Sequence, residues 1–183
     1  MKTGPPYRVL FLCTGNSARS IFAEYFLKRL GGSRFEAFSA GSHPSPTGAI
    51  NPATIKVLRE SFKIDASAAR SKSWDEFKEK GIQFDFVVTV CDQAREACPV
   101  WPGQPIVAHW GVDDPAHFIG SPEEKERVFK KVAMLLHHRI QIFTSLPLEK
   151  LDRLRVEELT RDLGKRTENE LPKLVGDSPE RVK

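Results

Sequence analysis

The segment from Val9 to Ser20 constrains the fold of this chain more than any other. Val9–Leu12 is a continuous apolar run with a β-branched member, which is typical of a buried parallel strand. After Ser20, apolar residues recur at helical spacing as far as Gly31 and Gly32. A loop between such a strand and helix carries unpaired N–H groups at the positive end of the helix dipole. The sequence therefore predicts an oxyanion-binding loop made of Thr14, Gly15, Asn16, Ser17, Ala18, Arg19 and Ser20.

Cys13 opens this loop and is the candidate nucleophile. Because a guanidinium and a helix start lie close to it, we expect its pKa to be lowered. Gly15 is expected to let the backbone turn closely around an anion, and Arg19 to bind two of the anion's oxygens. The alternative is a buried structural cysteine, since the spacing of Cys13 and Arg19 is unspecific by itself. The strand before and the helix after favour the nucleophile.

Strand and helix signals alternate along the chain, which predicts an α/β fold with a parallel sheet and right-handed crossovers. Further strands are expected at 35–41, 84–90 and 104–108. Capping signals predict helices that begin near Asn51-Pro52, Ser73–Glu76 and Ser121–Glu124. Apolar residues Leu151, Leu154 and Leu159 suggest a terminal helix up to Gly164.

Composition excludes several function classes. The 183 residues fit one α/β domain. The formal charge is only +4, and no basic face with interleaved aromatic residues is evident, so a nucleic-acid partner is not expected. Neither a membrane-spanning run nor a signal peptide is seen, so we expect a cytoplasmic protein without a membrane partner. Its three cysteines are then reactive or buried thiols rather than permanent disulfides.

The loop from Cys13 to Ser20 resembles the phosphate-binding loop of low-molecular-weight protein tyrosine phosphatases and of the arsenate reductases built on the same fold. The ordered motifs resemble the arsenate reductases that use three cysteines and recycle through thioredoxin. These motifs are Cys13–Ser20, Ser39–Gly41, Val88–Cys91, Cys98-Pro99 and His109–Pro115. The resemblance, over approximately residues 7–144, implies a three-layer sandwich around a central four-stranded parallel sheet, plus a C-terminal helical extension. The expected division is a reductase domain at 1–146, an additional helix at 147–164 and a flexible tail at 165–183.

The resemblance implies a relay of thiols. Cys13 would form an adduct with arsenate, and Cys91 would then attack Cys13 while arsenite leaves. Cys98 would attack Cys91 and move the disulfide into an exposed loop, provided that the polar segment between them is flexible. Thioredoxin is the implied reductant, with glutaredoxin or glutathione left open. The alternative is that Cys91 is a packed thiol and Cys98 an idle surface thiol. Without a Cys-x2-Cys pair, a zinc site is not expected.

Asp114 precedes Pro115 and matches the Asp-Pro acid of both related families. It is the expected general acid for the departing oxygen. Asp113 is the alternative, and two adjacent carboxylates are also compatible with a solvated turn. His109 and Trp110 are expected to pack and to position the loop.

Some reductases of this family bind potassium beside the loop. Asn16, Glu24 and Ser39 match three of the four ligand positions, but the position of the aspartate falls near Lys72. Its ammonium group would substitute for the cation by its own charge. We therefore expect no metal, no other cofactor and no potassium activation.

Two other functions are compatible with part of these residues. A phosphatase acting through a phosphocysteine needs only Cys13, Arg19 and Asp114, and leaves the other two cysteines unexplained. The residues after Asp114-Pro115 also lack the tyrosines that help such phosphatases hold an aromatic substrate. A non-enzymatic oxyanion-binding redox sensor would use the loop alone.

Overall fold

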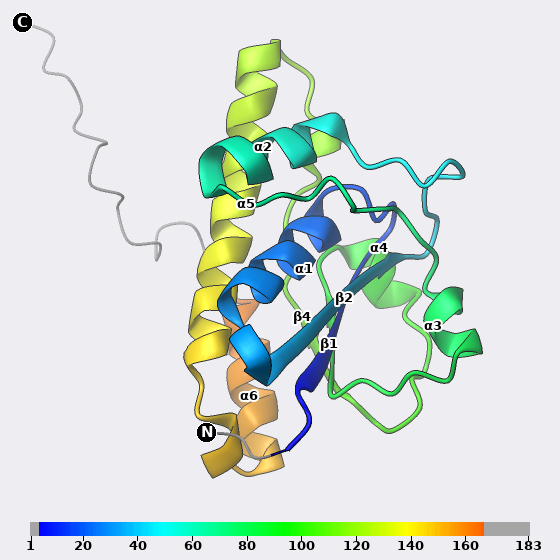
Figure 1. The fold of residues 1–183 in the computed structure, drawn as a ribbon, viewed down its shortest axis with the longest axis vertical. Coiled ribbons are helices and arrows are strands. Elements are labelled where there is room, and N and C mark those ends of the chain that lie inside the picture. Colours follow the sequence, from blue (N-terminus) through cyan, green and yellow to red (C-terminus); the bar gives the residue numbers. More distant parts are fainter. Residues whose placement is uncertain (1–3, 167–183) are drawn as a thin grey trace, which may run out of the picture.

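The computed structural model describes residues 4–166, which form a parallel sheet flanked by helices (Figure 1). The four strands are β1 (Tyr7–Cys13), β2 (Phe35–Gly41), β3 (Phe86–Thr89) and β4 (Ile106–His109). All neighbours are parallel, in the order β2-β1-β3-β4. The helices are α1 (Arg19–Leu30), α2 (Pro52–Phe62), α3 (Asp75–Glu79), α4 (Asp92–Glu96), α5 (Pro122–Ser145) and α6 (Arg153–Leu163). Short 3₁₀ turns lie at Gly32–Arg34 (η1), Pro115–His117 (η2) and Leu148–Lys150 (η3). The predicted α/β fold with a central four-stranded parallel sheet and a C-terminal helix is confirmed.

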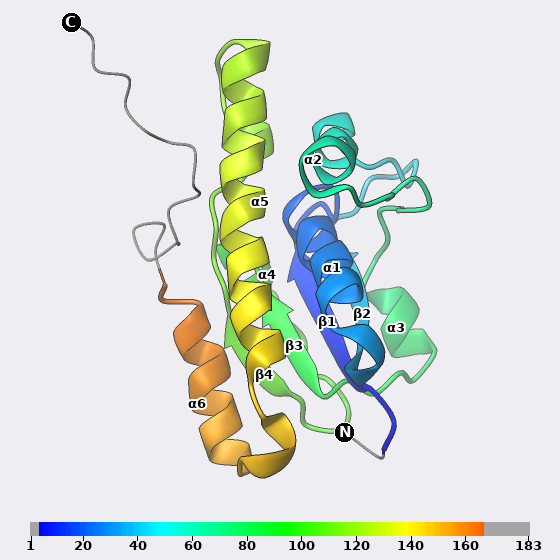
Figure 2. The same ribbon diagram turned by 60° about the vertical axis from the view of Figure 1, so that its left-hand side comes forward.

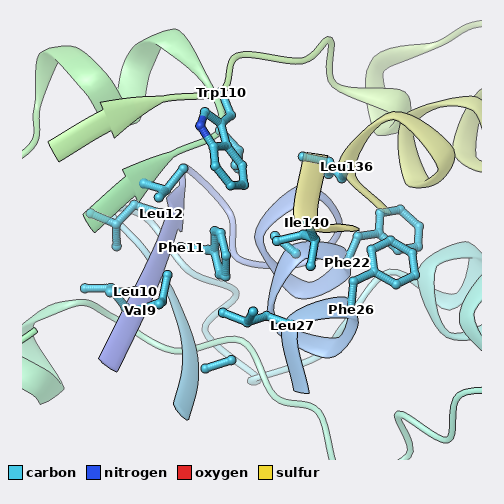
Figure 3. Packing of buried hydrophobic residues seen from close by; sticks show 14 of the residues in the cluster. Val9, Leu10, Phe11, Leu12, Phe22, Phe26, Leu27, Trp110, Leu136 and Ile140 are labelled. Carbon is cyan, nitrogen blue, oxygen red and sulfur yellow. The ribbon is translucent and has the colours of Figure 1, made fainter. Parts of the chain in front are cut away.

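The strand β1 lies at the centre of the hydrophobic core. Its residues Val9–Leu12 are completely buried, as expected for a strand with a neighbour on each side and helices over the sheet. Figure 3 shows Phe11 between the indole of Trp110 and the side chains that α1 and α5 contribute. The ring centroids of Phe11 and Trp110 are 6.0 Å apart. This packing fixes the end of β1, and with it the position of Cys13.

Two of the three predicted helix caps form as expected. The Asn51 side chain accepts a hydrogen bond from the Ala53 amide, and Ser121 and Glu124 make a complete capping box at the start of α5. The box predicted at Ser73–Glu76 was wrong, although α3 does begin there. The Glu76 carboxylate instead pairs with Arg70, at 2.6 and 2.8 Å, and is not available to the helix start.

The predicted terminal helix exists as α6, and its buried residues are not the leucines whose spacing suggested it. Leu154 is 78% exposed, whereas Val156, Thr160 and Leu163 are buried. Figure 2 shows α6 lying beside β4 and the C-terminal half of α5. The tail expected at 165–183 lies outside the described residues from position 167 onward. Within residues 4–166, no helix is both long enough and apolar enough to cross a membrane.

Candidate active site

The loop between β1 and α1 surrounds the sulfur of Cys13 with donors. The Asn16 backbone N–H donates to this sulfur over 3.1 Å, and the Ser20 hydroxyl lies 2.9 Å from it. Cys13 itself is 2% exposed, at the junction where the strand ends and the loop begins. The thiol is thus held at the base of the loop, at the carboxyl edge of the sheet where the sequence predicted it.

Asn16 braces the loop, and it adopts the left-handed backbone conformation. Its φ is 45°, and its side chain is completely buried. The amide Nδ2 donates to the hydroxyls of Ser20 and Ser39, each over 2.9 Å, and Oδ1 accepts from the Lys72 amide over 2.9 Å. These contacts offset the strain of a positive φ in a residue that tolerates it better than most.

Gly41 shapes the loop from the end of β2. A Cβ at this position would lie 2.4 Å from the Thr14 carbonyl oxygen and 3.0 Å from the Asn16 amide nitrogen. Only a residue without a side chain permits this approach. The motif Ser39–Gly41 therefore supports the loop in two ways. The Ser39 hydroxyl accepts a hydrogen bond from the Asn16 side chain, and Gly41 leaves room for the backbone of Thr14 and Asn16.

Burial sets the ionisation of Cys13 in this arrangement. Removal from water raises the pKa of the Cys13 thiol, while the Ser20 hydrogen bonds and the charge of Arg19 lower it. Burial outweighs these favourable contacts, so the predicted lowering of the pKa was wrong for this arrangement. Of the groups that favour a thiolate, Arg19 was predicted from the sequence, whereas the contact with the Ser20 hydroxyl was not.

Arg19 and Asp114 meet across the site although 95 residues separate them in sequence. Their side chains form a 2.6 Å ion pair, and Arg19 also donates to the Val112 carbonyl over 3.2 Å. The second carboxylate oxygen of Asp114 accepts from the Ala116 amide over 3.0 Å. We call residues 110–114 the acid loop. The predicted acid therefore lies beside the predicted oxyanion clamp.

A cavity of about 790 Å³ connects these groups. Of the predicted oxyanion loop, Thr14, Gly15, Ser17 and Arg19 line it. Asn16, Ala18 and Ser20 are buried. Both candidate acids, Asp113 and Asp114, line the same cavity, together with Cys91, Asp92, Gln93, His109, Gly111, Val112, Ala116, His117 and Gly164.

Cys91 faces the loop from the end of the neighbouring strand β3. Its sulfur lies 3.4 Å from the Thr14 hydroxyl, which also donates to Gln93 Oε1 over 3.0 Å. The sulfur further accepts from the Ala94 amide over 3.4 Å, so Cys91 caps α4. Cys91 is close enough to Cys13 for its charge to raise the pKa of the Cys13 thiol slightly, as the smallest of several contributions. The contact of Gln93 with Thr14 is not predictable from the sequence, because no local pattern marks the two residues as neighbours.

Cys98 lies apart from this cavity. It is half-buried rather than exposed, and it lines a neighbouring cavity of about 390 Å³ with Arg95, His109 and Arg161, among others. Burial raises the pKa of the Cys98 thiol, and the Trp101 side chain lowers it. The polar segment expected to be flexible is the helix α4. The structure thus brings Cys13 and Cys91 together but leaves Cys98 one helix away.

His109 and Trp110 hold the start of the acid loop, in agreement with the packing role predicted for them. Trp110 is completely buried, and the His109 ring contacts the Thr89 hydroxyl over 2.8 Å and the Asp92 carboxylate over 3.1 Å. Burial lowers the pKa of His109, and the charge of Arg95 lowers it further. Neutral imidazole is therefore favoured at this position.

The ammonium group of Lys72 lies among the residues that match the potassium ligands. Its nitrogen is 3.4 Å from the Ser39 hydroxyl and 3.8 Å from the Glu24 carboxylate, and the Ser39 hydroxyl donates to Glu24. Both charged side chains are mostly buried, at 12% and 8% exposure. Burial lowers the pKa of Lys72, while the Glu24 charge raises it. Within residues 4–166, no group of three or more His, Cys, Asp or Glu is placed to hold a metal.

This geometry predicts that the steady-state catalytic rate stays the same when sodium is exchanged for potassium. A positive charge already interacts with Glu24, so a potassium ion would meet repulsion from Lys72. The check is a steady-state rate in matched sodium and potassium chloride at constant ionic strength. A several-fold higher rate in potassium would contradict the expectation.

The comparisons with known proteins agree with this geometry. The family model of the low molecular weight phosphotyrosine protein phosphatases matches residues 8–157 and so ends within α6. An arsenate reductase of Oceanobacillus iheyensis is 39% identical over 135 residues, which are 74% of this chain and 93% of that protein.

Solved structures show the same relationship. An arsenate reductase in a phosphate-binding state has a TM-score of 0.62 at 27% identity, over 76% of this chain and 97% of that chain. A thioredoxin-dependent arsenate reductase of Corynebacterium glutamicum has a TM-score of 0.53 at 27% identity, over 77% of this chain and 65% of that chain. The chain therefore belongs to the low molecular weight phosphotyrosine protein phosphatase family, and the relatives that it resembles include arsenate reductases.

Proposed function

We propose that this protein reduces arsenate to arsenite with electrons from its own cysteines and is recycled by thioredoxin. The observation that carries the proposal is the second thiol, Cys91, which lines the same cavity as the oxyanion loop and lies 3.4 Å from the hydroxyl of Thr14, the residue after Cys13. A phosphatase of this fold needs one thiol there. A reductase needs two, because the conversion of As(V) to As(III) takes two electrons. The names of the arsenate reductases to which the chain is similar add support.

The first step binds arsenate in the loop and joins it to Cys13. Loop amides and the Arg19 guanidinium stabilise the oxyanion charge. The Cys13 thiolate forms a sulfur–arsenic bond, and the hydroxyl oxygen of hydrogen arsenate leaves as water after it accepts a proton from Asp114. Arg19 must share its donors between the oxyanion and Asp114, which is possible because a guanidinium has five N–H donors and Asp114 contacts only its Nη2.

The second step is the reduction itself. The Cys91 thiolate attacks the Cys13 sulfur, the sulfur–arsenic bond breaks, and its electron pair stays on arsenic, which leaves as arsenite. The product is a Cys13–Cys91 disulfide at the edge of the sheet. Since Cys13 is almost completely buried, this disulfide is hard for another protein to reach.

The third step moves the disulfide outward. Cys98 attacks Cys91, Cys13 leaves as a thiolate, and a Cys91–Cys98 disulfide forms. A fully helical path from Cys91 to Cys98 would separate their Cα atoms by roughly 10 Å, whereas a disulfide needs about 4.4–6.8 Å. Because α4 (Asp92–Glu96) forms most of this path, we expect it to unwind in this step. It has five residues, of which Ala94 alone is buried, so we expect this opening to cost little free energy.

Thioredoxin is the proposed reductant of the Cys91–Cys98 disulfide. The solved thioredoxin-dependent reductase to which the chain is similar supports this choice. Glutaredoxin with glutathione is the alternative. We also propose a cytoplasmic location, where such thiols stay reduced.

A thioredoxin-coupled assay with a Cys98→Ser variant tests the relay. The variant should release about one arsenite per chain and then stop, because its Cys13–Cys91 disulfide stays buried. Wild-type protein should continue to consume NADPH through thioredoxin reductase. Undiminished turnover of the variant, or turnover of wild type with glutathione and glutaredoxin alone, would contradict the thioredoxin relay.

A further inference from the structure

The C-terminal extension reaches the candidate active site, which the sequence did not indicate. Gly164, the residue after α6, lines the same cavity as Arg19 and Asp114. It lies beyond the segment that the family model matches, which ends at residue 157. The extension is therefore placed to affect the acid loop directly.

A single buried guanidinium joins the acid loop to the end of α6. Arg139, on α5, is 3% exposed. Its Nη1 donates to the carbonyl oxygens of Trp110 and Gly111, over 2.9 and 3.3 Å. Its Nη2 donates to the carbonyl oxygens of Gly164 and Arg166, over 3.2 and 2.9 Å. Two segments that are distant in sequence are thus held by one side chain.

Two further contacts tie the same segments together. The Trp110 indole N–H donates to the Thr160 carbonyl over 2.8 Å. Gly164 packs so closely on the start of the loop that a Cβ would lie 1.8 Å from the His109 carbonyl oxygen. The loop start is therefore in contact with α6 through an indole, a guanidinium and a glycine.

The charge of Arg139 is expensive to bury, which makes a purely space-filling role a poor explanation. Burial lowers the pKa of Arg139 to about 10, so the side chain remains protonated at neutral pH. Within residues 4–166, its four hydrogen bonds go to backbone carbonyls and not to carboxylates. Such bonds organise the backbone, because replacing the arginine would leave the buried Trp110 carbonyl and three partly buried carbonyls without this donor.

We propose that Arg139 and the end of α6 are positioning elements for Asp114, which hold the acid loop so that its carboxylate meets Arg19 across the cavity. Asp114 lies four residues after Trp110, the first residue of the loop that Arg139 holds. At the other end of the loop, Arg19 donates hydrogen bonds to the Val112 carbonyl and the Asp114 carboxylate. The loop is thus held from two sides, by Arg19 from α1 and by Arg139 from α5.

Hydrogen exchange of the full-length protein tests the proposal without reference to arsenate. In Arg139→Met, amide exchange of residues 109–116 should rise about tenfold or more, because the charged donor to the loop is lost. Arg139→Lys should give a smaller rise. The matched control is Arg155→Ala, which removes an exposed arginine of α6 that pairs with Glu158 away from the loop. Its exchange at 109–116 should equal that of wild type.

Kinetics supply the second readout, which rests on the proposed function. Misplacing the acid should lower kcat for arsenate by about 10- to 100-fold with little change in KM, and Arg139→Lys should restore part of the loss.

If Arg139→Met does not fold, Gly164→Ala replaces it, since its Cβ forces α6 away from His109. Unchanged exchange at 109–116, or an equal rise throughout the chain with unchanged kcat, would overturn the proposal. If the wild-type protein does not reduce arsenate, the proposed function is wrong. Hydrogen exchange at residues 109–116 then still tests whether Arg139 positions the acid loop.

Discussion

Cys13→Ser is expected to abolish arsenate reduction, with a loss of about 10⁴-fold or more in turnover. A serine hydroxyl at this position is neither deprotonated at neutral pH nor able to donate electrons to arsenic, so no adduct and no disulfide can form. The change is nearly isosteric, and the loop that Asn16 braces should remain intact. Turnover and arsenite release, measured with the wild-type protein in parallel, check the expectation.

The control for this variant is anion binding. Because the loop amides and Arg19 are unchanged, Cys13→Ser should bind phosphate or arsenate with an affinity close to that of wild type. Loss of both binding and turnover would indicate a damaged loop. Retained arsenite release would contradict the role of Cys13 as nucleophile.

Cys91→Ser is expected to separate the two chemistries that this fold supports. Without the second thiol, the adduct on Cys13 cannot be reduced, so arsenite release should fall below about 1% of wild type. Hydrolysis of an aryl phosphate uses Cys13, Arg19 and Asp114 and should persist wherever wild type shows it. Mass measurement of the protein after arsenate treatment should find no intramolecular disulfide.

A matched variant makes this result specific. Cys98→Ser removes the other thiol of the relay and should still release about one arsenite per chain. If Cys91→Ser and Cys98→Ser lost arsenite release to the same extent, both cysteines would be needed for the release of arsenite itself. Full reductase activity of Cys91→Ser would show that Cys91 is only a packed thiol and would contradict its role in the relay.

Much of the fold was predictable because its signals are local. The apolar run Val9–Leu12 identifies a buried strand, and Ser121–Glu124 identifies a helix start, without knowledge of any distant residue. Parallel strands bring their carboxyl ends to one edge, which placed Cys13 and Cys91 together. The capping box at Ser73–Glu76 failed because Arg70 competes for the Glu76 carboxylate, and local spacing cannot reveal that competition.

The remaining features of the site depend on distance in space rather than in sequence. Nothing near Arg139 in the chain indicates that it binds the carbonyls of Trp110 and Gly164. The raised pKa of Cys13 also could not be predicted, because it follows from complete burial, and the sequence shows only the neighbours that lower it. Lys72, in contrast, was found from sequence because it replaces an acidic residue in a recognisable pattern.

The central claim is that two electrons pass from this chain's own thiols to arsenate. The most direct measurement mixes fully reduced wild-type protein with arsenate, without any reductant, and determines arsenite, remaining thiols and the disulfide by peptide mass. The account predicts one arsenite per chain, the loss of two thiols and a Cys91–Cys98 disulfide. Preserved thiols without arsenite, together with ready hydrolysis of an aryl phosphate, would contradict it and identify a phosphatase.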